Sequence, residues 1–173
     1  MALLPKYSRA GADEFVTVGG ASDVEDLAEM VIARRQTPPP RKELRQMEAG
    51  EPTWSMDVVR HCVRNSWRHL SPGKVAERFG IAPRTLRDRL ADAQLPRPSD
   101  LCRMGHFLHA VELMRHGVTA PAEVAQRLGF GSATDMRKRK WQLAKTVEAD
   151  HRAAAFASQY GSLVDFLYSR GED

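Results

Sequence analysis

The chain contains one seven-residue pattern twice, as Val-Ala-Glu-Arg-Phe-Gly-Ile at residues 75–81 and as Val-Ala-Gln-Arg-Leu-Gly-Phe at residues 124–130. A proline lies three residues before each copy. A small residue, then glycine four positions later, then an apolar residue is the spacing of a helix-turn-helix. The alanine lets the second helix approach closely, and the glycine can adopt the left-handed conformation that ends the first helix. The repeat therefore predicts two helix-turn-helix units.

The composition is that of a globular protein. The chain has 173 residues, of which 42% are hydrophobic and 28% charged, which is enough for one substantial domain or two small ones. No apolar run approaches the ~18 residues of a membrane span, and the N-terminus lacks the apolar core of a signal peptide. Two cysteines, Cys62 and Cys102, do not make a disulfide scaffold. We therefore expect a cytoplasmic protein with no membrane partner.

Positive charge is concentrated where the repeats lie. Residues 56–146 carry 17 basic and 8 acidic residues, a net charge of +9. Residues 1–55 carry a net charge of −2 and residues 147–173 a net charge of −3. This division is typical of a nucleic-acid-binding unit between non-binding segments. A solvated basic surface is the alternative, and the overlap with the two repeats disfavours it.

The first 55 residues are expected to form an N-terminal segment with one amphipathic helix and a proline-rich linker. Ser22-Asp23-Val24-Glu25 is a capping box that begins a helix over residues 22–35. Three consecutive prolines at 38–40 stop this helix. A short strand at 15–18 and a short helix at 41–49 are further options.

From residue 56 onward the apolar spacing is helical. Serine, proline and glycine residues mark the helix ends, with Ser71 and Ser132 as N-caps and Gly80 and Gly117 as stops. Ser99 or Asp100 is the expected cap of a long helix that joins the two units. The predicted helices cover residues 56–69, 72–79, 84–93, 100–116, 121–128 and 132–146, followed by one or two helices in 147–170 split at Gly161. The predicted fold class is all-α, with two helix-turn-helix units joined by a long linker helix and helical flanking segments.

These residues resemble the DNA-binding domain of AraC-type transcriptional regulators. The resemblance rests on residues 71–86, on Val-Ala-Gln-Arg-Leu-Gly-Phe at 124–130, and on Ala110, Leu113 and Met114 of the linker helix. It covers about residues 56–146 and implies a double helix-turn-helix domain that binds DNA. Ala82 stands where the family usually has a capping serine, and the closing Gly-x-x-Pro segment is absent. The upstream segment is too short for the family's effector-binding barrel, so we expect no small-molecule effector domain.

The second helix of such a unit lies in the major groove, where its N-terminal half meets base edges. Leu86 and Leu90 in the first unit, and Met136 in the second, are expected to point inward. Arginine can read guanine through two hydrogen bonds, and threonine can meet the thymine methyl group. The predicted base contacts are therefore the outward Arg84, Thr85, Arg87, Thr134 and Arg137.

Further cations are expected to contact phosphates, which positions a protein without reading sequence. They are Arg89, Lys138, Arg139, Lys140 and Lys145. For each of these side chains, and for each predicted base contact, the alternative is a solvated surface charge. Two units on one chain would enter adjacent major grooves about one helical turn (~34 Å) apart.

Three residues of the linker helix have side chains that can bind a metal. Cys102, His106 and His109 share a helix face, and with His61 or Cys62 they could hold zinc. The spacing of a zinc module is missing, and the same face is the expected packing surface of the linker helix. The sequence contains no glycine-rich phosphate loop, nucleophile elbow or convincing catalytic carboxylate pair. We therefore expect no metal, no cofactor and no enzymatic activity.

The flanking segments suggest protein contacts. Apolar stripes in residues 22–35 and 147–170 must be buried somewhere, either on the chain's own domain or against a partner. A homodimer or RNA polymerase is the expected partner. The function predicted by the sequence is sequence-specific binding of double-stranded DNA by a transcriptional regulator. The alternatives are a phage-type DNA-packaging or DNA-recognition subunit, and a protein-interaction adaptor that reuses the helix-turn-helix fold.

Overall fold

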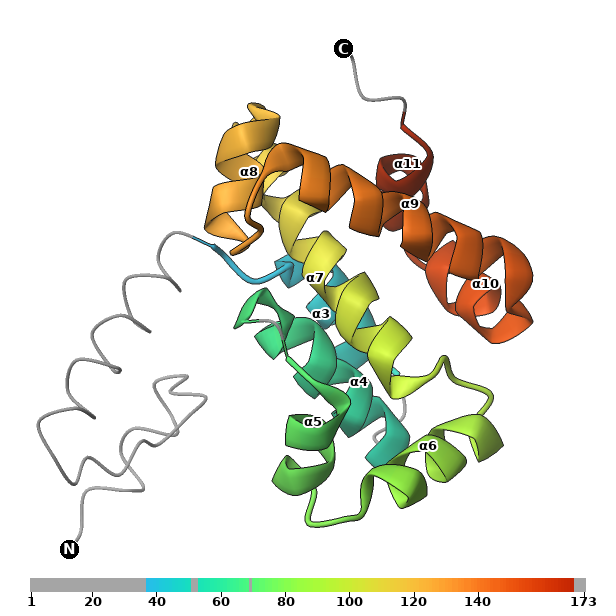
Figure 1. Ribbon diagram of the computed structural model, residues 1–173. Coiled ribbons are helices and arrows are strands. Elements are labelled where there is room, and N and C mark those ends of the chain that lie inside the picture. Colours follow the sequence, from blue (N-terminus) through green and yellow to red (C-terminus); the bar gives the residue numbers. More distant parts are fainter. Residues whose placement is uncertain (1–36, 51–52, 69, 170–173) are drawn as a thin grey trace, which may run out of the picture. The chain divides into compact units, whose positions relative to one another are not determined.

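The computed structural model describes residues 37–50, 53–68 and 70–169, which belong to one structural unit, residues 37–173. These described residues form nine α-helices and one 3₁₀ helix and contain no strand (Figure 1). The expected all-α fold is confirmed. The strand considered at 15–18 and the helix expected at 22–35 lie outside the described residues.

The helices follow one another closely. In chain order they are α3 (Arg41–Glu48), α4 (Trp54–Asn65), the 3₁₀ helix η1 (Ser66–Arg68), α5 (Pro72–Arg78), α6 (Pro83–Asp92), α7 (Pro98–Arg115), α8 (Pro121–Arg127), α9 (Ala133–Ala149), α10 (His151–Ser158) and α11 (Gly161–Tyr168). The short helix considered at 41–49 is therefore present as α3. Helix α4 begins at Trp54, two residues earlier than expected, because the Thr53 side chain accepts a hydrogen bond from the Met56 amide and caps it.

The two repeats form turns with the same hydrogen-bond pattern. Gly80 has φ +63° and Gly129 has φ +73°, so each glycine takes the left-handed conformation that ends a helix. The next amide in each turn reaches back five residues, from Ile81 to the Ala76 carbonyl at 3.0 Å and from Phe130 to the Ala125 carbonyl at 2.9 Å. Helices α5 and α6 form the first helix-turn-helix unit, and α8 and the start of α9 form the second.

Helix α7 is the centre of the fold. It contacts α4, η1, α5, α6, α8, α9 and α11, and α6 and α8 lie near its opposite ends in Figure 1. Its buried residues cover every side of the helix from Leu101 to Leu113, whereas the sequence indicated one apolar stripe. Gly105 permits the closest approach, since a Cβ there would lie 2.9 Å from the Val63 Cα and 2.7 Å from the Ser66 Oγ. The linker helix is thus a core helix shared by both units.

The start of α7 differs from the expectation. The helix begins at Pro98, and neither Ser99 nor Asp100 caps it, because proline already fits the first helical position. Asp100 is instead buried and paired with Arg103. Burial raises the pKa of Asp100, and the neighbouring Arg103 only partly offsets this effect.

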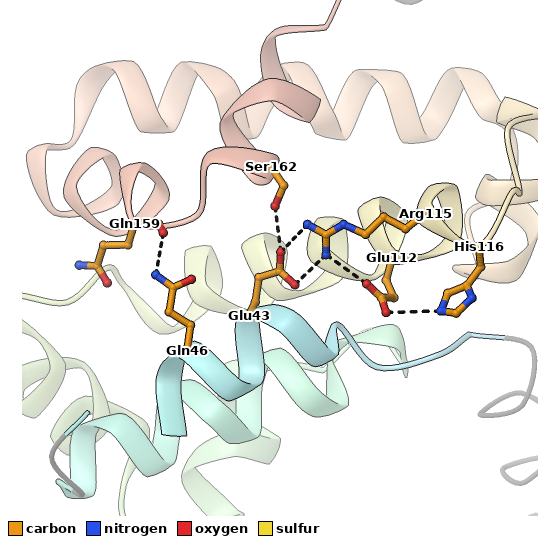
Figure 2. Close-up of polar contacts among 7 residues, drawn as sticks. All are labelled: Glu43, Gln46, Glu112, Arg115, His116, Gln159 and Ser162. Carbon is orange, nitrogen blue, oxygen red and sulfur yellow. Dashed lines mark hydrogen bonds and ion pairs between the residues drawn. The ribbon is translucent and has the colours of Figure 1, made fainter. Parts of the chain in front are cut away.

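Helix α3 belongs to the core rather than to a linker. Leu44 and Met47 are buried, and Glu43, with 2% of its surface exposed, reaches α7 and α11. The Arg115 guanidinium donates hydrogen bonds to both Glu43 carboxylate oxygens, at 2.8 and 3.0 Å, and the Ser162 hydroxyl donates a third at 2.9 Å (Figure 2). Burial by itself would raise the pKa of Glu43. The hydrogen bonds from Arg115 and Ser162 outweigh the effect of burial, so the pKa of Glu43 is lowered overall. We call these three residues the Glu43 clamp.

The C-terminal helices also complete the core. Phe156, Tyr160, Leu163 and Leu167 are all buried, at 0–4% exposed surface, by packing of α10 and α11 on α9 and α7. The apolar stripe of 147–170 is therefore covered by the chain itself, and it does not support the partner contact expected there. The other segment, 22–35, lies outside the described residues.

The boundaries expected at residues 55 and 146 do not separate the described residues in space. Helix α9 continues through residue 146, and α3, α10 and α11 share one core cluster with the two units. The three segments were distinguished by net charge, which does not report where apolar surface is buried. None of the described helices is both long and apolar enough to cross a membrane.

Candidate nucleic-acid interface

The outward face of α6 carries three of the predicted base contacts, but an acid lies among them. Arg84 and Arg87 are exposed, and Thr85 is half-buried. The Asp88 carboxylate lies 3.8 Å from the Arg84 Nε and 3.4 Å from the Arg87 Nε. Leu86 and Leu90 are fully buried on the opposite face, as expected. The first unit therefore presents arginines whose charge is partly balanced within the same helix.

Arg89 is held against the body of the first unit. Its guanidinium carbon lies 5.0 Å from the centre of the Trp54 ring, within the range of a cation–π contact. Trp54 in turn packs edge-on against Phe79, with 5.8 Å between the ring centres. Arg89 is exposed, so its charge faces solvent at the junction of α4 and α6.

The outward face of α9 is more strongly cationic. The Ser132 hydroxyl accepts a hydrogen bond from the Asp135 amide at 3.1 Å and caps the helix, as the sequence predicts. Thr134, Arg137 and Lys138 are exposed, and neither cation forms an ion pair with any residue that the structure describes. Met136 is buried beneath them. The first turns of α9 thus offer two cations that are available to a ligand.

The remaining cations of α9 have partners. Arg139 lies 3.4 Å from the Asp135 carboxylate, and the Lys145 ammonium lies 2.9 Å from that of Glu148. Both side chains are more than half exposed. The hydrogen bond with Glu148 raises the pKa of Lys145. These two predicted phosphate contacts lie on the surface, and each has an acid one helical turn away.

Lys140 does not join the outward face. Its ammonium donates to the Ser169 carbonyl at 2.8 Å and to the Ser169 hydroxyl at 2.9 Å, and it lies 4.9 Å from the centre of the Phe166 ring. Burial lowers the pKa of Lys140. The phosphate contact expected of this residue is thus replaced by an attachment to the end of α11, because α11 packs on this side of α9.

A groove of about 430 Å³ separates the start of α5 from α7 and α9. Its walls include Ser71, Ser99, Arg103 and Arg139, and Phe107 and Phe130 line its apolar part. Both arginines are already engaged, Arg103 with Asp100 and Arg139 with Asp135. The groove therefore contributes little unbalanced charge between the two units.

The residues considered for zinc are part of the core. The two ring nitrogens of His109 lie 2.8 Å from the Val63 carbonyl oxygen and 3.1 Å from that of Pro38. His106 Nε2 lies 3.0 Å from the Leu128 carbonyl oxygen, and Cys102 interacts with the Cys62 thiol. Burial lowers the pKa of His109. No group of three His, Cys, Asp or Glu residues within the described ranges is arranged to hold a metal.

The contacts predicted from the sequence do not include Trp141 of α9. The side chain has 62% of its surface exposed, more than any other large apolar residue in the described part of the chain. The signal was present, because Trp141 lies four residues after Arg137 and three after Lys138, both expected to face outward. No protein-family model, curated protein or solved structure matches this chain.

Proposed function

We propose that this chain is a sequence-specific, double-stranded DNA-binding transcriptional regulator. The observation that carries the proposal is the start of α9, a capped second helix of a helix-turn-helix that exposes Thr134, Arg137 and Lys138. A second helix-turn-helix at the other end of α7 supports the same proposal. The resemblance of residues 56–146 to AraC-type DNA-binding domains supports it from the sequence.

The two units have different tasks in this proposal. Helix α9 enters the major groove, where Arg137 meets a guanine edge and Lys138 meets a phosphate. Helix α6 enters a neighbouring groove through Arg84 and Arg87. Its binding to the phosphates is weaker, because the Asp88 carboxylate is negatively charged. The shared core helix α7 sets the spacing of the two contacts, so the bound site is asymmetric and a single chain can read it.

The wider setting follows from the same activity. We place the protein in the cytoplasm in this proposal, where a transcriptional regulator meets DNA and RNA polymerase. A homodimer or polymerase contact through residues 22–35 stays part of the proposal, because their apolar spacing predicts an amphipathic helix. Residues 147–170 are left out of that contact, since their apolar stripe is buried in the chain's own core.

Selection of bound duplexes from a random DNA library tests the proposal. The full chain should enrich one sequence with two half-sites about one helical turn apart. Affinity should fall steeply with salt, with about 0.9 added to the slope of log affinity against log salt for each phosphate neutralised. The full chain is required, since a fragment of 56–146 would lack α3, α10 and α11. No enrichment together with salt-independent binding would overturn the proposal.

A further inference from the structure

Trp141 lies in the middle of the most cationic surface of the second unit. Thr134, Lys138, Trp141 and Lys145 are spaced i, i+4, i+7 and i+11, so they follow one face of α9. All four side chains are exposed. Arg137, one turn before Trp141, borders the same face. We call these five residues the Trp141 face.

The aromatic surface continues onto α11. Tyr168 has 48% of its surface exposed, and the next residue, Ser169, accepts a hydrogen bond from the Lys140 ammonium of α9 at 2.8 Å. The Lys145 ammonium lies 6.0 Å from the centre of the Trp141 ring. Lys145 therefore lies beside Trp141, and Tyr168 is the exposed aromatic residue at the end of the helix that packs on α9.

Charge decides what this surface fits. The Trp141 face carries three cations, of which Lys145 is paired with Glu148, and Asp135, paired with Arg139, lies next to Thr134. Cations grouped around an exposed tryptophan fit a polyanion better than an apolar protein surface, and the DNA backbone offers an acceptor for each donor present. The indole N–H and the tyrosine hydroxyl donate to phosphate oxygens, the ring surfaces pack on deoxyribose, and the ammonium groups pair with phosphates.

Position leads to the same ligand. A duplex that meets Arg137 and Lys138 must also approach Trp141, because residues three and four apart on a helix are neighbours on its surface. Later turns of a helix seated in the major groove leave the bases and reach the sugar-phosphate strand beside it. Lys145 lies further along in that direction, and Tyr168 is next to Ser169, which is bonded to Lys140 of the same helix.

We propose that Trp141 and Tyr168 form, with Lys145, a docking site for the sugar-phosphate backbone of duplex DNA next to the groove that α9 enters. The inference rests on the proposed function. It gives α11 a direct part in DNA binding. It also means that two uncharged aromatic rings contribute to DNA binding on a surface whose other proposed contacts are cations.

Acrylamide quenching of tryptophan fluorescence on the full chain gives the first test. Exposed Trp141 is open to the quencher in free protein and should become protected when a saturating duplex is added. Added duplex should no longer reduce quenching in the Trp141→Phe variant. It should still reduce quenching in the matched Trp67→Phe variant. Quenching of the wild-type chain that is unchanged by bound duplex would overturn the inference.

Affinity gives the second test, measured with the selected duplex and with a random duplex of equal length. Trp141→Ala should weaken both about tenfold, which corresponds to ~1.4 kcal/mol, and leave the salt slope unchanged, since no charge is removed. Trp141→Phe should weaken both less, because an aromatic ring remains while the N–H donor and part of the ring surface are lost. Lys145→Ala should lower the salt slope by about 0.9. Melting curves of all variants establish that they fold.

The outcomes separate this inference from the proposed function. If the wild-type chain binds no duplex, both fail. If the wild-type chain binds and Trp141→Ala binds each duplex as tightly as the wild-type chain does, the docking site fails and the proposed function stands. If Trp141→Ala keeps its DNA affinity but loses self-association, the surface belongs to a second copy of the chain, and the inference is overturned.

Discussion

The two helix-turn-helix units have the same turn but differ in the helix that follows it. Helix α6 has 10 residues, no side-chain cap at Ala82 and arginines that share the Asp88 carboxylate. Helix α9 has 17 residues, a hydrogen-bonded cap at Ser132 and cations at Arg137 and Lys138 that are not paired with any described residue. Repetition of a motif thus conserves the turn while the exposed chemistry changes.

The surroundings of the two units differ as well. The second unit is backed by α10 and α11, which pack on α9, whereas α6 contacts only α5 and α7 extensively within the described residues. A long helix supported along its inner face can present its outer face without bending. We therefore expect the second unit to supply most of the DNA affinity and the first unit to add orientation.

Removing the support of α9 should have the largest effect on the molecule. Leu163 is fully buried between α11 and its neighbours, so Leu163→Ala should lower the free energy of unfolding by about 2–5 kcal/mol through lost burial and the cavity that remains. Urea titration followed by circular dichroism measures this change. A loss confined to α10 and α11, with the rest of the chain still folded, would contradict a shared core.

Tyr168→Ala is the matched control on the same helix. Its side chain is nearly half exposed, so the free energy of unfolding should change much less than in Leu163→Ala. The two variants together distinguish a core role for α11 from a surface role.

The second prediction compares the arginines of the two recognition helices. Arg137→Ala should weaken binding to the selected duplex by about 1–3 kcal/mol and relax preference at one base pair. Arg84→Ala should cost less, because Asp88 already competes with DNA for that guanidinium. Equilibrium binding to the selected site and to single-base variants of it measures both changes. Equal losses in the two variants would break the proposed division between the units.

Asp88→Asn sharpens this comparison. The amide keeps the size of the side chain and removes the negative charge that balances Arg84 and Arg87. Affinity for DNA should therefore rise, most strongly at low salt where surface charges are least screened. A fall in affinity would mean that Asp88 itself contacts the DNA, for example by accepting from a cytosine amino group.

The third prediction concerns the Glu43 clamp, which ties α3 and α11 to the C-terminal end of α7, where the second unit begins. Glu43→Gln removes the charge opposite Arg115 and should lower the free energy of unfolding by about 1–3 kcal/mol. Asp100→Asn is the control. Burial raises the pKa of Asp100, so its ionised form is disfavoured in the fold and a neutral amide should cost little.

Acid should reproduce the loss of the clamp. The pKa of Glu43 is lowered in the folded state from its usual 4.5, so its ionised form stabilises the fold. That contribution is fully present above the unfolded pKa and is lost as pH falls through the folded value. Urea titrations from pH 6 down to about pH 3 should therefore show a smaller loss of stability in Glu43→Gln than in the wild-type chain. If the free energy of unfolding falls with pH equally in both proteins, ionisation of Glu43 does not contribute to stability.

Local signals in the sequence predicted the helix-turn-helix turns and several helix ends correctly. Gly80, Gly129 and Ser132 act through bonds to residues at most five positions away, so the sequence contains all the information that they need. The inward positions Leu86 and Met136 follow from the helical period alone. The outward positions of α6 and α9 follow from the same period, which is why Trp141 could have been found.

Long-range packing could not be predicted in the same way. Glu43 and Arg115 lie 72 residues apart, and neither has a local feature that marks it as a partner of the other. Lys140 was expected to face DNA because its charge matches that of its neighbours along α9, yet its orientation is set by α11, 29 residues further along the chain. The net charge of residues 147–173 suggested a separate segment, whereas burial of Phe156 and Leu163 makes them part of the core.

The smallest expected effect comes from exchanging the caps of the two units. Ser132→Ala removes the acceptor for the Asp135 amide and should lower the free energy of unfolding by about 1 kcal/mol. Ala82→Ser supplies an acceptor that α6 lacks, at a residue whose extended backbone (φ −68°, ψ 147°) is close to that of a capping residue, and should raise the free energy of unfolding by up to about 1 kcal/mol. Chemical denaturation resolves both signs. The double variant should be close to wild type, because the two caps lie in different units and share no partner. A stabilising Ala82→Ser that leaves DNA affinity unchanged would mean that α6 is already fully formed when it meets DNA, and that the weakness of the first unit lies in its Asp88 charge rather than in a frayed helix start.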